Sequence, residues 1–282
     1  MLSYRHAFHA GNHADVLKHC ILVAMLRHMN KKDKPWWYVD SHAGAGIYDL
    51  HSDYARKIGE FEGGIGRLWP RTDLPELVAD YVDQVRALNS DGKLRLYPGS
   101  PWLASRIMRP DDQLRLFELH STDAQLLRHV FSESSRHIKV EEQDGLAGLK
   151  SVLPPQPRRG VILMDPSYEM KDDYKLVPRA LKESLERFAT GTYAVWYPQL
   201  QRIEARDLPE KLKRLPVKSW LHVSLSVRKP AADGFGMHGS GLFIVNPPWQ
   251  LAEQLQATLP WLTDCLAEDA GASHQLEHWE AA

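Results

Sequence analysis

Cysteine is scarce in this 282-residue sequence: it has only Cys20 and Cys265, and both fall inside apolar patterns typical of helices. Two such cysteines do not form the disulfide framework of a small secreted domain, so a reduced, cytoplasmic compartment is expected. The sequence also lacks an apolar signal core after Met1 and any run near the roughly 20 apolar residues of a membrane span. We therefore expect a cytoplasmic protein without a membrane part.

Net charge is also small, because 35 Lys and Arg residues against 36 Asp and Glu residues leave a formal charge of −1. This balance neither indicates nor excludes a nucleic-acid partner, since phosphate contacts depend on a local basic face. Apolar residues make up 43% of the chain, and no tract has the biased composition of a disordered segment. No internal repeat is evident. The length suits one α/β domain with an insertion.

Strand and helix patterns alternate along most of the chain. Short apolar runs predict strands at 36–40, 114–119, 138–141, 160–165, 192–197, 218–227 and 241–246. Helical patterns separate the earlier strands, which favours parallel pairing, whereas the last two strands are joined by a glycine-rich loop too short for a helical crossover. The sequence therefore predicts an α/β fold with a mostly parallel, Rossmann-like sheet whose last hairpin is antiparallel.

One segment interrupts this alternation. Residues 47–97 contain a glycine-rich piece and an amphipathic helix that begins near Asp73, with Pro75 in its first turn. We predict an inserted helical subdomain at 47–97. It would separate 1–46, which hold the N-terminal tail, a helix capped by Asn12 and the first strand with its turn, from 98–282, the remainder of the main domain.

Glycine turns and acidic residues stand where the predicted strands end. In chain order these are His42-Ala43-Gly44-Ala45-Gly46, Glu118, Asp144-Gly145 and Asp165-Pro166-Ser167-Tyr168. Each one alone is ordinary: a tight turn, a solvated strand terminus, a helix cap, a strand stopped by proline. Because ligands of doubly wound sheets bind outside the carboxyl ends of the strands, the set together predicts a glycine loop, a ribose-binding acid and an adenine-binding turn at one edge.

The spacing between the glycines and the next strand-end acid indicates the kind of cofactor. A dinucleotide fingerprint needs a third glycine, where this chain has Asp49, and an acid about 20 residues further on. Here the next acid that ends a strand is Glu118. This disfavours a pyrophosphate cofactor, whereas a nucleoside cofactor without phosphates, such as S-adenosylmethionine, needs only the turn, the acid and the adenine pocket.

The residues after the 160–165 strand suit methyl transfer to an exocyclic amine of adenine. The lone pair of that amine is delocalised into the ring and must be localised before it can attack. Acceptance of its two hydrogens by the Asp165 carboxylate and the Pro166 carbonyl would favour a tetrahedral nitrogen facing the methyl group. We predict that Tyr168 stacks on a flipped base.

A second stretch has a similar form. Asn246-Pro247-Pro248-Trp249 also follows a predicted strand and also combines an acceptor, prolines and an aromatic ring. We favour Asp165 because the strand before Asn246 belongs to the antiparallel hairpin, so its end should lie on the opposite rim of the sheet.

Five motifs together resemble the RlmJ family of 23S ribosomal RNA adenine-N6 methyltransferases. They are Tyr4 to His19 (YRHAFHAGNHADVLKH), His42 to Gly46 (HAGAG), Tyr97 to Pro101 (YPGSP), Ala194 to Pro198 (AVWYP) and Asn246 to Trp249 (NPPW). The similarity spans nearly the whole chain. It implies a methyltransferase sheet, S-adenosylmethionine as cofactor, 23S rRNA as partner and the N6 amine of adenine 2030 as target.

The resemblance also implies roles for individual residues. Those expected to contact the cofactor are His19, His42, Gly44 in its turn, Ser100, Glu118, Asp144, Gly145 and Asp165. Asp165 would also accept the amine proton, Tyr4 would meet the RNA, and His6 and Lys18 would help to build the substrate site. The family usually has a second proline where this chain has Ser167, which leaves the Pro166 carbonyl in place, so methyl transfer is expected to survive.

Other features receive simpler interpretations. The histidines at 6, 9, 13 and 19 follow no familiar zinc spacing, so no metal is expected. Two basic clusters, 27–34 and 202–214, would ordinarily be solvated faces, but one of them with Arg158 and Arg159 could supply a phosphate footprint. The glycine-rich loop 231–241 is a candidate lid. We expect a monomer; the alternative functions are a DNA adenine-N6 methyltransferase and a non-catalytic RNA-binding or ribosome assembly factor.

Overall fold

A computed structural model describes residues 6–133 and 137–281 of the protein. Its main sheet has eight strands in the order β10-β8-β9-β7-β6-β1-β4-β5. Five strands are parallel: β1 (Trp37–Asp40), β4 (Gln113–Phe117), β5 (Ile138–Glu141), β6 (Gly160–Met164) and β7 (Thr192–Gln199). Strand β9 (Gly239–Val245) lies antiparallel between β7 and β8 (Ser219–Ser226). The predicted parallel sheet with a final antiparallel hairpin is confirmed.

Strand β10 (Ser273–Glu280) was not predicted from the sequence. It pairs antiparallel with β8 along its whole length, from Ser273 opposite Ser226 to Glu280 opposite Ser219. Seven of its eight residues are exposed, so it has no alternation of apolar and polar side chains. Backbone pairing with β8 therefore forms this edge strand, and the period-2 signal on which strand prediction depends is missing.

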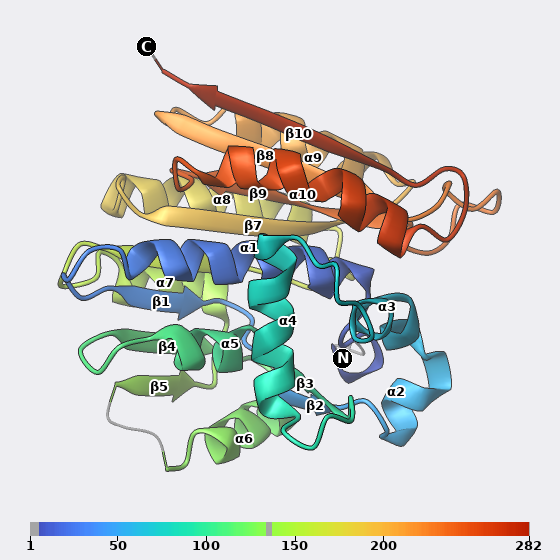
Figure 1. Ribbon diagram of the computed structural model, residues 1–282. Coiled ribbons are helices and arrows are strands. Elements are labelled where there is room, and N and C mark those ends of the chain that lie inside the picture. Colours follow the sequence, from blue (N-terminus) through green and yellow to red (C-terminus); the bar gives the residue numbers. More distant parts are fainter. Residues whose placement is uncertain (1–5, 134–136, 282) are drawn as a thin grey trace.

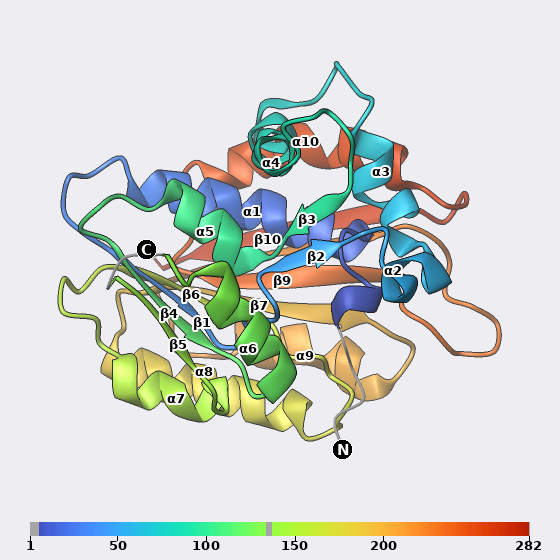
Figure 2. The ribbon, with the colours of Figure 1, turned by 90° about the horizontal axis from the view of Figure 1, so that it is seen from below.

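Helices cover both faces of the sheet (Figure 2). On one face lie α1 (His13–Met29), α5 (Ser100–Ile107) and α10 (Leu251–Leu266), and on the other lie α7 (Gly145–Val152), α8 (Asp173–Arg187) and α9 (Ile203–Lys213). Helix α6 (Ser121–Val130) contacts β5. Because the central strands are covered twice, they are apolar on both sides, and all five residues of β6 are buried.

Helix α1 begins as the sequence predicts. The Asn12 side chain accepts hydrogen bonds from the backbone N–H groups of Ala14 and Asp15, both at 3.0 Å. These bonds satisfy two of the donors that a helix start leaves without intrahelical partners. Most of α1 is buried, including Asp15, Lys18 and His19, because the helix lies between the sheet and α4 (Glu76–Leu88). Polar residues of α1 are therefore held inside the protein.

The segment 47–97 contains β2 (Ile47–Asp49), α2 (Asp53–Ile58), the 3-10 turn η2 (Glu60–Gly63), α3 (Ile65–Leu68), α4 and β3 (Leu96–Pro98). A second 3-10 turn, η1 (His6–Phe8), precedes α1. Strands β2 and β3 pair antiparallel, so the chain leaves and re-enters the main domain at neighbouring points. Helix α4 crosses α1 (Figure 1) and also contacts α10. Its buried residues are Leu77, Val78, Tyr81, Val82 and Val85, whereas Leu88, which the apolar pattern also predicts to face inward, is only partly buried. The helix begins at Glu76 rather than Asp73.

No helix within the described ranges combines the length and the apolar character that a membrane crossing requires.

Candidate active site

A cavity of about 480 Å³ lies at the carboxyl ends of β1, β4, β6 and β7. Strands β4 and β5 lie on one side of β1, and β6 and β7 lie on the other, so the connections reverse direction between β1 and β6. Such a reversal is where open α/β sheets bind their ligands. The cavity volume is within the usual range of small-molecule sites. The fold therefore places this cavity at the edge where the sequence predicts a ligand site.

Most of the predicted site residues line this cavity. They are His6, Lys18, His19, His42, Gly44, Ser100, Glu118, Asp144, Gly145, Asp165 and Pro166. Tyr4 lies outside the residues that the structure describes. Residues separated by up to 160 positions are thus brought together, because the parallel strands all end at one rim and the start of α1 lies beside them.

The stacking role predicted for Tyr168 does not fit the structure. Its side chain is 1% exposed, and the residue is not among those that line the cavity. The ring packs against Tyr174 and Trp196, and its hydroxyl donates a 2.8 Å hydrogen bond to the Trp196 carbonyl. A left-handed backbone, with φ of 54°, turns the ring away from the cavity and into the core. Tyr168 therefore supports the wall instead of forming it.

Trp196 is an aromatic residue of the cavity lining for which the sequence predicted no role. It lines the cavity from β7 together with Pro198, two positions further along the same face of the strand. The Lys18 ammonium lies 5.6 Å from the centre of its ring. Its indole N–H is buried without a hydrogen-bond partner in the described part of the chain. The sequence prediction took its site residues from positions where strands end, whereas Trp196 lies within a strand.

One half of the cavity is built around Glu118, at the end of β4. Its two carboxylate oxygens accept hydrogen bonds from the backbone N–H groups of Gly44, at 2.8 Å, and His120, at 2.7 Å. Burial raises the pKa of Glu118, and these two donors oppose the rise. Each oxygen retains a second lone pair, so the anchored carboxylate can still accept hydrogen bonds from a ligand.

The turn before α7 closes the same half of the cavity. The Asp144 side chain caps α7 by accepting a hydrogen bond from the Ala147 N–H. Gly145 packs so closely on the turn after β1 that a Cβ atom would lie 1.9 Å from the Ser41 carbonyl oxygen. Only glycine fits this approach, which joins the ends of two strands in one wall.

Asp40, the last residue of β1, lies behind the cavity surface. Its carboxylate accepts hydrogen bonds from the hydroxyls of Tyr38 and Ser100, both at 2.6 Å, and from the His42 N–H at 3.2 Å. Burial raises the pKa of Asp40, while these three donors counteract it. Asp40 therefore fixes the positions of Ser100 and of the turn that carries His42.

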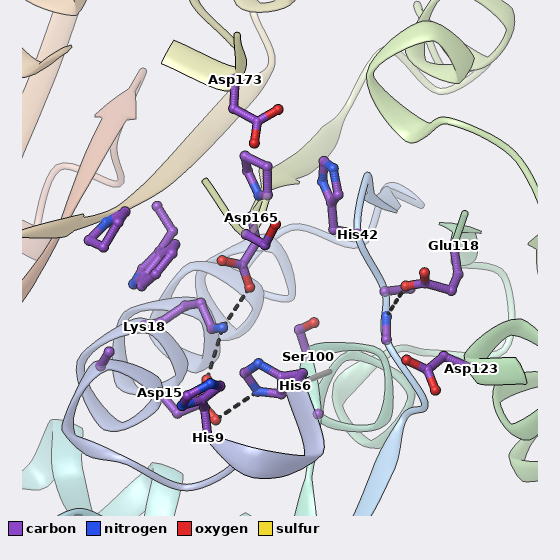
Figure 3. Close-up of a pocket in the computed structure, with 18 of the residues that line it drawn as sticks. His6, His9, Asp15, Lys18, His42, Ser100, Glu118, Asp123, Asp165 and Asp173 are labelled. Atoms are coloured by element: carbon purple, nitrogen blue, oxygen red, sulfur yellow. Dashed lines mark hydrogen bonds and ion pairs between the residues drawn. The ribbon is translucent and has the colours of Figure 1, made fainter. Parts of the chain in front are cut away.

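The other half of the cavity holds a chain of charged groups (Figure 3). The Lys18 ammonium lies 2.6 Å from an oxygen of Asp165 and 2.9 Å from an oxygen of Asp15, and the other oxygen of Asp15 is 3.0 Å from the His6 ring. The Gly11 N–H also donates to Asp15. Asp15, for which no site role is predicted from the sequence, joins His6 to Lys18 and so holds the lysine against Asp165.

Burial and charge act in opposite directions in this chain of groups. Burial raises the pKa of Asp165 to about 6, although Lys18 favours its ionised form. Burial alone would lower the pKa of Lys18, but Asp15 and Asp165 outweigh it, so the pKa is raised. Burial also opposes ionisation of Asp15, yet His6 and Lys18 bring its pKa well below the usual range. At neutral pH the group is Asp15⁻, Lys18⁺ and Asp165⁻.

The two remaining histidines of the predicted set are neutral. Burial lowers the pKa of His19 to about 3 and that of His42 to about 4. The His19 ring nitrogen lies 2.8 Å from the Tyr97 hydroxyl, which in turn bonds to Tyr81 of α4. The ring of His42 is hydrogen-bonded to the Ser41 hydroxyl. These rings contribute shape and hydrogen-bonding groups, not charge.

The Asn246 alternative is excluded by its position. Val245 pairs with Tyr193 near the start of β7, so Asn246 lies at the rim opposite the cavity. Its side-chain amide donates hydrogen bonds to the carbonyls of Ala189 and Gly191. Asn246 thus lies at the opposite rim, as its place after the antiparallel strand predicts, whereas Asp165 lines the cavity. Among the described residues, no group of three or more His, Cys, Asp or Glu side chains is arranged to hold a metal ion.

Comparison with known proteins identifies relatives that are all described as methyltransferases of large-subunit ribosomal RNA, together with one similar crystal structure. The family model described as "Ribosomal RNA large subunit methyltransferase D, RlmJ" matches residues 33–280. Proteins named Ribosomal RNA large subunit methyltransferase J are 45% identical in Haemophilus influenzae, over 98% of both chains, and 46% identical in Escherichia coli, over 99% of both chains. The crystal structure of a Legionella pneumophila protein matches with a TM-score of 0.86 and 35% identity, covering 95% of this chain and 98% of that one.

Proposed function

The chain belongs to the RlmJ family of ribosomal RNA large subunit methyltransferases, and on that premise we propose that it methylates the N6 amine of an adenine in 23S ribosomal RNA. S-adenosylmethionine is the proposed methyl donor, and adenine 2030 is the proposed target. The observation that carries the choice of an exocyclic amine is the position of Asp165 and Pro166, which line the cavity at the end of β6.

The charge of the cavity suits a cationic cofactor that lacks phosphates. Within the described lining, Lys18 is the single Lys or Arg side chain, and it is paired with two carboxylates. The acids of the lining are Asp15, Glu60, Glu118, Asp123, Asp144, Asp165 and Asp173. A pyrophosphate would find no free cation there, whereas a sulfonium is favoured by this excess of negative charge. We propose that the Glu118 carboxylate accepts hydrogen bonds from the hydroxyls of the ribose.

The mechanism follows from groups that are already in place. S-adenosylmethionine would supply an electrophilic methyl group with its own leaving group. The Asp165 carboxylate and the Pro166 carbonyl would accept the two N–H hydrogens of the amine, so that the nitrogen lone pair points at that methyl group. Asp165 would then take the proton released by methylation. Lys18, held by Asp15, keeps Asp165 ionised and fixed in direction, which is what such positioning requires.

We propose that Trp196 provides the aromatic surface for the flipped base, in place of Tyr168. It lines the cavity, its ring lies next to Lys18, and Tyr168 and Tyr174 pack behind it. Base stacking on an aromatic ring contributes roughly 1–3 kcal/mol. We also propose a monomer, because one chain supplies the groups that this mechanism uses, and a cytoplasmic location.

The test is methylation of protein-free 23S rRNA with S-adenosylmethionine labelled in the methyl group, followed by mass spectrometry of the nucleosides. Label in N6-methyladenosine, and its absence after Asp165→Ala, would support the proposal. Transfer into duplex DNA but not rRNA would identify the DNA methyltransferase alternative. Tight rRNA binding without any label would identify the non-catalytic assembly factor.

A further inference from the structure

The loop between β8 and β9 lies at the rim that holds the cavity. Strands β7 and β8 run in the same direction, since both pair antiparallel with β9, so β8 ends at the same rim as β7. Gly236 and Met237 of this loop line the cavity directly. Figure 2 shows the loop extending past the end of β9. The segment 227–238 therefore joins the catalytic cavity to the surrounding surface.

The tip of this loop presents one aromatic side chain to solvent. Phe235 is 79% exposed, the largest exposure among the large apolar residues described. It lies between Gly234 and Gly236, which have φ values of 79° and 83° and so give the tip a backbone that other residues rarely adopt. The Phe235 N–H donates a 3.0 Å hydrogen bond to the Asp233 side chain, which closes the turn.

The base of the loop is held in place. The Arg228 side chain donates a 3.1 Å hydrogen bond to the Met237 carbonyl and forms an ion pair with Glu268. On the other side, the Gln201 amide donates to the Ala231 carbonyl. The loop is therefore anchored at both ends and carries an apolar ring beyond its anchors, next to the cavity. A ring held in this position, beside the cavity and open to solvent, is available to contact a partner that occupies the cavity.

The proposed function supplies that partner, and the inference rests on it. An adenine inside a structured RNA must leave its stack to reach Asp165, and its departure opens a gap between the neighbouring bases. Proteins that open base stacks fill such gaps with apolar side chains. We propose that Phe235 enters the RNA stack at the position vacated by the target adenine, while Gly236 and Met237 form the adjoining wall of the cavity.

The test compares Phe235→Ala with a matched control, Trp249→Ala. Trp249 is 76% exposed but follows β9 at the opposite rim, so its loss removes a similar exposed ring without touching the cavity. With protein-free 23S rRNA, Phe235→Ala is expected to lower kcat/KM about 10-fold or more, as the loss of one stacking contact implies. Phe235→Trp should retain most activity, and Trp249→Ala should match the wild type.

Three further measurements separate this role from a structural one. An RNA with 2-aminopurine at the target position should gain fluorescence with the wild type, because the base unstacks, and should not with Phe235→Ala. The KM for S-adenosylmethionine and the Tm should not change. Wild-type kinetics and fluorescence in Phe235→Ala would overturn the inference, as would a loss that is accompanied by a lower Tm or weaker cofactor binding. Absence of methylation by the wild type would instead refute the proposed function.

Discussion

Replacement of Asp165 by asparagine is expected to abolish methyl transfer and, at the same time, to stabilise the protein at neutral pH. Burial raises the pKa of Asp165 from 3.8 to about 6, despite the opposing effect of Lys18. Because the folded protein favours the protonated carboxyl, ionising it costs about 3 kcal/mol of stability above pH 6. Asparagine has a similar shape and no charge to bury. Lys18 keeps its 2.9 Å contact with Asp15, so its charge stays paired.

The stabilisation by Asp165→Asn should depend on pH. A carboxyl whose pKa is raised by folding contributes stability that is fully present below about pH 4 and is lost as the pH rises through about 6. The difference in unfolding free energy between Asp165→Asn and the wild type should therefore be small near pH 4. It should grow to about 3 kcal/mol in favour of the variant at pH 8. Such a result would mean that the wild type gives up stability by burying its proposed catalytic carboxylate.

Urea unfolding followed by circular dichroism, at several pH values between 4 and 8, measures this difference, and labelled S-adenosylmethionine measures activity. Asp123→Asn is the control, because it removes a carboxylate beside Glu118, at the end of the cavity away from Lys18 (Figure 3). If Asp165→Asn were no more stable than the wild type at pH 8, burial could not be opposing ionisation of Asp165. If it kept near-normal activity, the carboxylate could not be the acceptor of the amine hydrogen.

Three further substitutions test the site. Lys18→Met removes the cation beside Asp165, so the pKa of that carboxyl should rise further and the acidic limb of the kcat/KM profile should move to higher pH; an unchanged profile would contradict the pairing. Gly145→Ala places a Cβ atom 1.9 Å from the Ser41 carbonyl, so calorimetry should show weaker binding of S-adenosylmethionine, and an unaltered Kd would mean that this turn shifts freely. Glu118→Gln should raise the Kd about 10-fold or more, as loss of a charged acceptor implies, and equal affinity would remove Glu118 from the ribose site.

Much of the fold could be predicted because its signals are local. The apolar run 161–164 stands out because β6 is buried on both faces, and the Asn12 cap is recognisable from neighbouring residues alone. Strand β10 has no such signal, since backbone pairing with β8 forms it and its side chains are mostly exposed. That residues 47–97 form a separate subdomain stays a prediction: the segment leaves and returns at β2 and β3, yet α4 packs on α1 and α10.

The sequence by itself determined which strands end in carboxylates and glycine turns, and parallel strands that share one rim bring those ends together. It therefore predicted that Glu118, Asp144 and Asp165 lie together, and all three line the cavity. Only the tertiary structure decided which way each side chain points: a left-handed backbone at Tyr168 turns its ring into the core and leaves Trp196 at the cavity. Only the packing of α1 over the sheet joins Asp15 and Lys18 to Asp165, because contacts between distant residues depend on how whole elements pack and leave no periodic mark in the chain.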